Sequence, residues 1–182
     1  MTGRRSRKPR PPLDAGQLKE LALAYVARFA TSRAKLAAYL GRKVRERGWE
    51  GSGEPPIDML VAKAAEAGFV DDAAFALSKA RSLTARGYGS RRVRQALLAA
   101  GVDDADGEAA REHARDDAVQ AALHFAKRRR LGPFAGERSD PKVKEKALAA
   151  MVRAGHDFHL SKVIIALDPG TDFDPQAFED ER

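Results

Sequence analysis

The 182-residue sequence contains no cysteine and few aromatic residues. Without cysteine there is no disulfide framework, no thiolate metal site and no cysteine nucleophile, which suits a reducing cytoplasm, where we expect the protein to act. Aromatic residues make up only 7 % of the chain and alanine is abundant, which favours helices over strands. No apolar run approaches the roughly 20 residues that span a bilayer, and no secretory signal is recognisable.

Motifs that carry catalysis are also absent. The chain has no Gly-x-x-x-x-Gly-Lys-Ser/Thr loop and no Gly-x-Ser-x-Gly elbow. The glycine-rich segment 86–90 follows a predicted helix rather than a strand, which argues against a dinucleotide site. His156 and His159 have no third ligand at a zinc spacing. We therefore expect a protein that is not an enzyme and that has no catalytic residue, cofactor or metal.

Charge of one sign predominates at each end of the chain. The N-terminal tail covers residues 1–15, and its first 12 positions hold five bases and no acid. Residues 168–182 contain six acids and one base. Both tails contain proline and lack apolar periodicity, which predicts disorder. Because the tails nearly cancel, the net charge of +7 belongs to the residues between them.

Acidic residues are also missing from Ala73 to Val102, and an acidic block follows directly. A predicted helix begins in this stretch at Ser90, and its first turn is rich in arginine. Free N–H groups at a helix start and forked guanidinium donors both favour phosphate. The alternative interpretation is a solvated basic face. The candidate residues for binding nucleic acid or a protein partner, with Tyr88 as the one stacking candidate, are Lys79, Arg81, Arg86, Tyr88, Arg91, Arg92 and Arg94.

Hydrophobic periodicity predicts about nine helices and no strand. The sequence leaves open whether the sixth helix, at about 105–113, is separate from the seventh, at about 116–130. The predicted first helix covers about 16–30. Residues predicted to cap helices are Ser32, Asp71, Asp72, Ser90 and Asp140.

Three glycines that end predicted helices, Gly48, Gly101 and Gly155, lie 53 and then 54 residues apart. This spacing indicates an elongated all-α array of three tandem three-helix units, in which each unit packs mainly on its neighbours. The predicted units cover residues 16–68, 69–113 and 114–167. The alternative is a single compact bundle whose glycine caps are evenly spaced.

A set of short motifs in the middle of the chain resembles the RecX family of bacterial recombination regulators. The motifs follow one another from Leu60 to Val102, and the resemblance covers roughly residues 18–167. The chain departs from the family pattern at Lys35, where an acid is frequent, and at His156, where an aromatic residue is common. The matching segments are 67–72, Phe75-Ala76, Arg81, 87–90, Val93, Leu97 and Gly101-Val102, flanked by Tyr25, Arg28, Ser32, Leu36, 153–155 and Val163-Ile164.

This resemblance implies a non-catalytic protein built of three tandem three-helix units. It implies binding to the RecA recombinase and its DNA filament, with modulation, mainly inhibition, of recombinase activity. The implied partners are the RecA filament and single-stranded DNA, with double-stranded DNA as a further ligand, and the expected state is a monomer. Whether the basic stretch faces DNA or RecA stays open. The alternative is a helical protein that recognises duplex DNA through residues 90–100.

Overall fold

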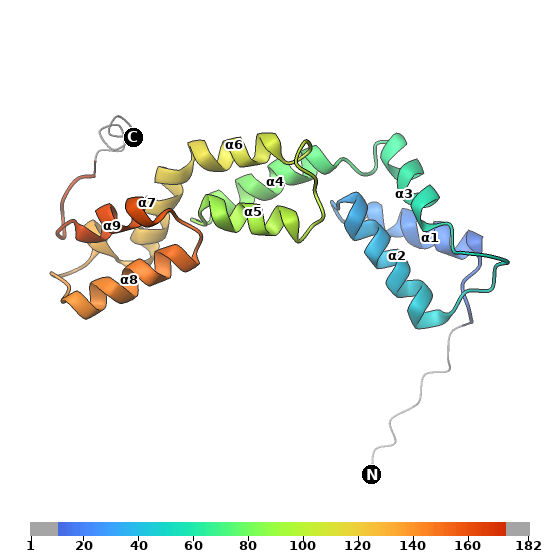
Figure 1. The fold of residues 1–182 in the computed structure, drawn as a ribbon, viewed down its shortest axis with the longest axis horizontal. Coiled ribbons are helices and arrows are strands. Elements are labelled where there is room, and N and C mark those ends of the chain that lie inside the picture. The colour runs from blue at the N-terminus through green and yellow to red at the C-terminus, as the bar shows by residue number, and fades with distance from the viewer. Residues whose placement is uncertain (1–10, 174–182) are drawn as a thin grey trace, which may run out of the picture. The chain divides into compact units, whose positions relative to one another are not determined.

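Helices make up almost all of the regular structure (Figure 1). The computed structural model describes residues 11–173. Within that part there are nine α-helices, one short 3-10 helix and no strand, which confirms an all-α helical array. The helices are α1 (Ala15–Val26), α2 (Arg33–Arg47), α3 (Ile57–Glu66), α4 (Asp72–Thr84), α5 (Ser90–Leu98), α6 (Glu108–Asp116), α7 (Ala118–Arg129), the 3-10 helix η1 (Gly132–Phe134), α8 (Pro141–Arg153) and α9 (Phe158–Ala166).

Capping side chains begin several of these helices. Ser32 accepts a hydrogen bond from the N–H of Lys35 at the start of α2, at 3.2 Å. Asp71 and Asp140 accept equivalent bonds, at 2.8 and 2.9 Å, at the starts of α4 and α8. At Asp117 the chain leaves helical geometry, so α6 and α7 are separate helices.

Glycines at positive φ follow several helices, including α3 at Gly68 and α4 at Gly87. Gly48, Gly101 and Gly155 follow α2, α5 and α8 and have φ angles of 86°, 66° and 96°, which residues other than glycine rarely adopt. The even spacing of these glycines is therefore a spacing of helices. Contacts divide the described chain into two compact units between Phe75 and Ala76. The division into three units, like the elongated shape, remains a prediction.

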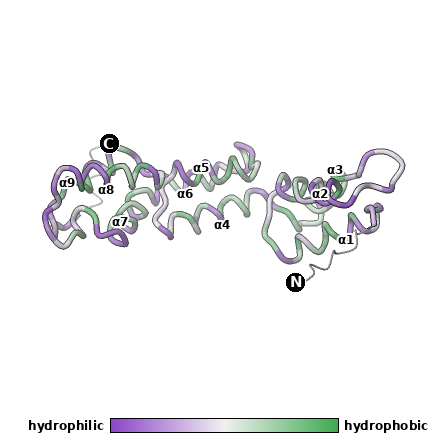
Figure 2. Tube along the Cα trace, turned by 90° about the horizontal axis from the view of Figure 1, so that it is seen from below, coloured by the Kyte–Doolittle hydropathy of each residue, from purple (hydrophilic) through white to green (hydrophobic). Residues whose placement is uncertain are grey.

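In the first unit α1, α2 and α3 pack against one another around Leu18, Leu36 and Leu40, which are fully buried. Apolar and polar residues alternate along these helices at the helical period (Figure 2). The prediction that Asp72 caps its own helix, α4, is wrong. Its buried carboxylate instead accepts a hydrogen bond from the N–H of Arg33, at 2.8 Å. Asp72 thus satisfies the start of α2, and Asp71 caps α4.

The predicted disorder of residues 1–15 is wrong for residues 11–15. Leu13 is fully buried in the first unit. Its N–H donates to the carbonyl of Gly48 at 3.0 Å, and its carbonyl accepts from the N–H of Glu50 at 2.9 Å. Asp14 then caps α1 through the N–H of Gln17, at 2.7 Å. A single leucine among prolines has no periodicity, so only its tertiary contacts reveal its place. The rest of this tail, residues 1–10, lies outside the described residues.

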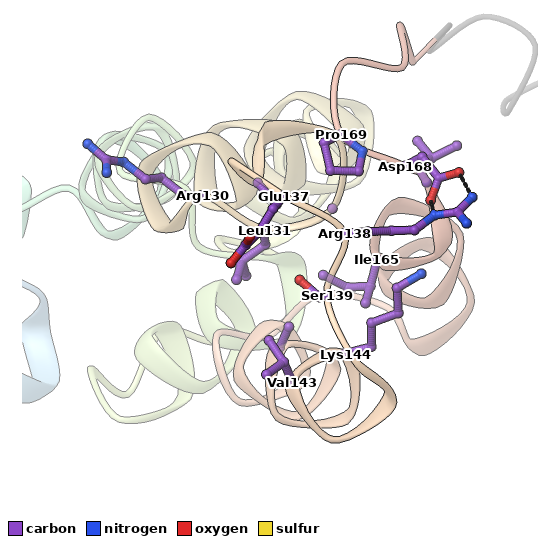
Figure 3. Close-up of a pocket in the computed structure, with 14 residues that line it drawn as sticks. Arg130, Leu131, Glu137, Arg138, Ser139, Val143, Lys144, Ile165, Asp168 and Pro169 are labelled. Atoms are coloured by element: carbon purple, nitrogen blue, oxygen red, sulfur yellow. Dashed lines mark hydrogen bonds and ion pairs between the residues drawn. The ribbon is translucent and has the colours of Figure 1, made fainter.

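The predicted disorder of the acidic tail is wrong for residues 168–173. Asp168 forms an ion pair with Arg138, whose Nε lies 2.8 Å from one carboxylate oxygen (Figure 3). The N–H of Gly170 donates to the carbonyl of Pro133 at 2.9 Å. The adjacent pocket measures only about 40 Å³, room for about one water, so it is a packing gap rather than a ligand site. Residues 174–182 lie outside the described residues.

In the second unit the start of α5 rests on the backbone between α8 and α9. The N–H of Gly89 donates to the carbonyl of Ala154, and that of Arg91 to Gly155, both at 3.1 Å. A Cβ on Gly155 would lie 2.5 Å from the backbone nitrogen of Arg92, and one on Gly89 would overlap the Gly155 backbone. Ser90 therefore does not cap α5, because Gly89 occupies that position and only glycine fits there.

His156 continues this junction into the core. It is buried, and its Nε2–H donates to the carbonyl of Gly87 at 3.1 Å. Its ring lies edge-on to that of Phe125, with centroids 5.4 Å apart. Burial lowers the pKa of His156 to about 4, only partly opposed by the bond to Gly87. The neutral imidazole thus fills the core position at which the sequence departs from the family pattern.

We predict that Gly155→Ala lowers the free energy of unfolding of the second unit by about 3 kcal/mol, because strain at positive φ adds to a backbone clash. Gly170 also has a positive φ, of 79°, but a Cβ there would meet nothing within 4 Å. Gly170→Ala should therefore cost only about 1 kcal/mol. Urea unfolding followed by circular dichroism measures both, and equal losses would contradict the backbone contact.

We predict that His156 makes the second unit acid-sensitive. The unfolded imidazole has a pKa near 6.5 and the folded one about 4, so the neutral form is the one that folds. Stability is therefore complete above about pH 6.5 and falls as the pH drops toward 4. Urea midpoints should show a loss of about 2 kcal/mol between about pH 7 and about pH 5.

In this measurement His156→Gln should remove that part of the pH dependence. The matched control is His159→Gln, at an exposed position three residues on, which should retain it. The same slope in the wild type and in His156→Gln would refute the assignment.

Candidate nucleic-acid interface

Four arginines from two helices line one groove of the second unit. Arg91 and Arg94 come from α5, and Arg111 and Arg115 from α6, which packs against α5. Asp157 also contributes to the lining of this groove of about 280 Å³, as does Ser90. We call this feature the arginine groove. Of the predicted site residues, the structure places Arg91 and Arg94 here.

Helical periodicity explains why the arginines face the groove. Positions 91 and 94, and positions 111 and 115, lie three and four residues apart and so share one face of their helices. Val93 and Leu97 bury the other side of α5. In the same way Ala110 and Ala114 bury the other side of α6. Burial of the apolar stripe of each helix therefore leaves the guanidinium groups at the surface.

Counter-charges are unevenly distributed in the groove. Glu108 accepts hydrogen bonds from Arg111 at 2.9 Å and from Arg115 at 3.0 Å. These two bonds hold the pKa of Glu108 below its ordinary value. Neither Arg91 nor Arg94 forms an ion pair with any residue in 11–173. Arg111 also pairs with Asp104, at 3.4 Å, so acids offset part of the charge on the α6 side of the groove. On the α5 side, Asp157 is the one acid among the described residues that line the groove.

The start of α5 is less available to an anion than the sequence predicts. The N–H of Arg91 is bonded to Gly155, and those of Arg92 and Val93 to the carbonyl of Gly89. The prediction that free N–H groups at this helix start bind phosphate is therefore wrong for Arg91, Arg92 and Val93. Arginine side chains remain as the donors that a phosphate can reach at this end of the helix.

Tyr88 lies among cations but is anchored in the core. It is half-buried and packs against the cluster formed by α7, α8 and α9. The guanidinium carbons of Arg86 and Arg92 lie 5.6 and 6.0 Å from its ring centroid. Arg128 of α7 donates to the carbonyl of Arg86 at 2.8 Å. Tyr88 thus holds two of the predicted arginines, which disfavours a role as a free stacking platform.

The two remaining predicted residues are on α4. Arg81 is exposed and Lys79 half-buried, and neither lines the arginine groove. Sequence reasoning missed Arg111 and Arg115, since they lie inside the block read as acidic. The available signal was that two arginines four residues apart each follow an alanine, Ala110 and Ala114, so that an apolar stripe and a basic stripe run side by side along the helix.

The described residues contain neither a metal-binding cluster nor a membrane-spanning helix. No group of three or more histidine, cysteine, aspartate or glutamate residues in 11–173 is placed to hold a metal ion. No helix in the same residues is long and apolar enough to cross a membrane. The arginine groove is accordingly the feature on which we base a function.

A known protein family matches the segment that contributes Arg91 and Arg94 to this groove. The second three-helix domain of RecX matches residues 71–110, which include α4, α5 and the start of α6. Among solved structures, the crystal structure of RecX from Lactobacillus salivarius is similar with a TM-score of 0.59. That match has 18 % identity and covers 83 % of this chain and 94 % of the other, so it shows the fold.

Two relatives extend the similarity over the chain. The regulatory protein RecX of Myxococcus xanthus (strain DK1622) is 31 % identical over 182 residues, covering 91 % of this chain and 94 % of that protein. The regulatory protein RecX of Mycobacterium sp. (strain JLS) is 31 % identical over 159 residues, 82 % of each chain. With this identity over nearly the full length of both proteins, the chain belongs to the RecX family of regulatory proteins.

Proposed function

We propose that this protein binds the RecA recombinase on its DNA filament and restrains recombinase activity. It acts without catalysis or cofactor, as a monomer, in the cytoplasm. The observation that carries the proposal is the convergence of four arginines from α5 and α6 in the second unit of a RecX-family chain. We assign the arginine groove to the DNA of the filament and not to RecA itself.

The choice of DNA follows from the donors in the groove. A guanidinium presents a planar fork that matches two phosphate oxygens, and it stays charged at every physiological pH. Phosphate contacts carry no base preference, as suits a regulator that meets DNA of any sequence. The same contacts are available on double-stranded DNA, which is the second ligand that we propose.

The junction at Gly155 argues against sequence-specific duplex recognition through α5. A recognition helix reads base edges with its first turns inside the major groove. Here the first turn of α5 is covered by the backbone of Ala154 and Gly155, to which the N–H groups of Gly89 and Arg91 are bonded. Backbone contact from the exposed arginines fits this arrangement better than base readout.

A titration with RecA tests the proposed function directly. Stoichiometric amounts of the protein should slow strand exchange and ATP hydrolysis by RecA on single-stranded DNA. The protein with both Arg91→Gln and Arg94→Gln should need a higher concentration for the same effect. No modulation by the wild type would refute the function.

We predict that the same double variant weakens binding to single-stranded DNA by at least about tenfold, because two charge-assisted contacts are lost. The slope of log K against log salt should become shallower by about 1.4. Fluorescence anisotropy over a salt series measures both. The matched control carries Lys142→Gln and Lys146→Gln, two exposed lysines on α8 outside the groove. Equal losses in both variants would mean that net charge alone governs binding.

Glu108 should lower the affinity of the arginine groove for single-stranded DNA. Because its carboxylate binds both Arg111 and Arg115, a phosphate must displace it to reach them. We predict that Glu108→Gln tightens binding to single-stranded DNA by about threefold to tenfold. The control is Glu112→Gln, on the same helix, which removes the same charge but has no ion pair within residues 11–173. An equal gain from both would contradict a specific role of Glu108.

A further inference from the structure

The first unit carries an apolar groove between α1 and α3. Its volume is about 480 Å³. Three large apolar side chains on its rim remain strongly exposed: Leu23 by 45 %, Met59 by 49 % and Phe69 by 57 %. Its lining also includes small residues, namely Ala15, Gly16, Ala22, Ala64 and Ala67. Large apolar surface gathered in one groove is typical of an interaction site, whereas single exposed apolar residues are not.

Charge is divided between the two flanks of α3. The residues that line the apolar groove include two lysines, Lys19 and Lys63, and no acid. On the other flank of α3 a separate polar groove is lined by Asp58 and Glu66 together with Arg33. An acidic segment is therefore attracted to the apolar groove and repelled by the acids of the other flank. This asymmetry is what selects the charge of the occupant.

We propose that the α1–α3 groove docks a protein partner through an amphipathic helix that carries apolar anchors flanked by acidic residues. Apolar side chains spaced one helical turn apart would fill the groove beside Leu23, Met59 and Phe69. Acidic side chains on the same helix would meet Lys19 and Lys63. The small residues of the groove allow the backbone of the docked helix to approach α1 and α3 closely.

A protein segment suits this groove better than a small ligand does. Sites for small molecules combine apolar walls with a few polar groups that fix one orientation. The polar side chains lining this groove are two long, flexible lysines, so they set a sign of charge without setting a ligand orientation. Helix-in-groove binding needs little more than apolar anchors and a charge of the right sign.

The test uses the full chain and a fluorescein-labelled helical peptide of about 16 residues, a length at which a helix is marginally stable in water. Leucines at i, i+4 and i+7 form its apolar face and glutamates flank them, and a matched peptide carries lysines in place of the glutamates. Fluorescence anisotropy should show that the wild type binds the acidic peptide at least about tenfold more tightly than the lysine peptide.

One variant tests the apolar contact in the groove, and a second tests the attraction of its lysines for acidic side chains. Met59→Glu should weaken binding of the acidic peptide by at least about tenfold, because it removes an apolar contact and adds a repelling charge. Lys19→Glu with Lys63→Glu should reverse the preference, so that the lysine peptide binds more tightly. Both changes are at exposed positions, and an unchanged circular dichroism spectrum verifies folding.

Leu98→Glu is the matched control for the apolar change. Leu98 is 78 % exposed and lies on α5, outside the apolar groove, so this variant should bind the acidic peptide like the wild type. Equal losses from Met59→Glu and Leu98→Glu would overturn the proposal, as would equal binding of the two peptides by the wild type. Self-association that Met59→Glu abolishes would also overturn it, since a second copy would then be the occupant.

The proposed docking in this groove and the proposed DNA contact can be refuted separately. The variant with Arg91→Gln and Arg94→Gln leaves every residue of the apolar groove unchanged, so it should bind the acidic peptide with wild-type affinity. Met59→Glu should in turn leave binding to single-stranded DNA within about twofold of the wild type, because Met59 does not line the arginine groove.

Discussion

The second unit depends on one contact between two backbones. Gly89 lies against the backbone of Gly155, and Gly155 lies against that of Arg92, so neither glycine has room for a Cβ, and α5 begins at this contact. The hydrogen bonds from Gly89 and Arg91 to the α8–α9 connection fix the direction of the helix. His156 extends the same junction into the core through Gly87. The direction in which α5 presents its arginines is therefore set by residues more than fifty positions away in the sequence.

This contact also determines which groups can bind an anion. Donors at a helix start are ordinarily a ready site for phosphate, but here those of Arg91, Arg92 and Val93 are bonded to protein carbonyls. The groups left to bind a phosphate are guanidiniums, and how readily they do so depends on the acids that pair with them. Arg91 and Arg94 form no ion pair within residues 11–173, whereas Arg111 pairs with Asp104 and Glu108, and Arg115 pairs with Glu108. In the proposed contact with DNA, the acids that pair with Arg111 and Arg115 would lower the affinity of the groove for phosphate.

Local sequence predicted the helices well because caps, glycines and apolar periodicity act over a few residues. The all-α class, the glycine ends and the starts at Ser32 and Asp140 follow from such signals. Leu13, Ser90 and Asp72 were misread because their places depend on distant partners. The candidate site was half predictable, since an acid-free stretch revealed Arg91 and Arg94. Arg111 and Arg115 enter the site only through the packing of α6 on α5.

The two units carry grooves that recognise through different physics. Phosphate contacts by arginine release counterions and weaken steeply as salt rises. The apolar part of docking in the α1–α3 groove does not weaken with salt and strengthens with some salts, whereas the attraction to Lys19 and Lys63 is screened. A nucleoprotein filament presents both kinds of surface, phosphates along its DNA and side chains on its protein. The proposed DNA contact would therefore weaken more with salt than the apolar part of the proposed docking contact, so a salt series can separate the two.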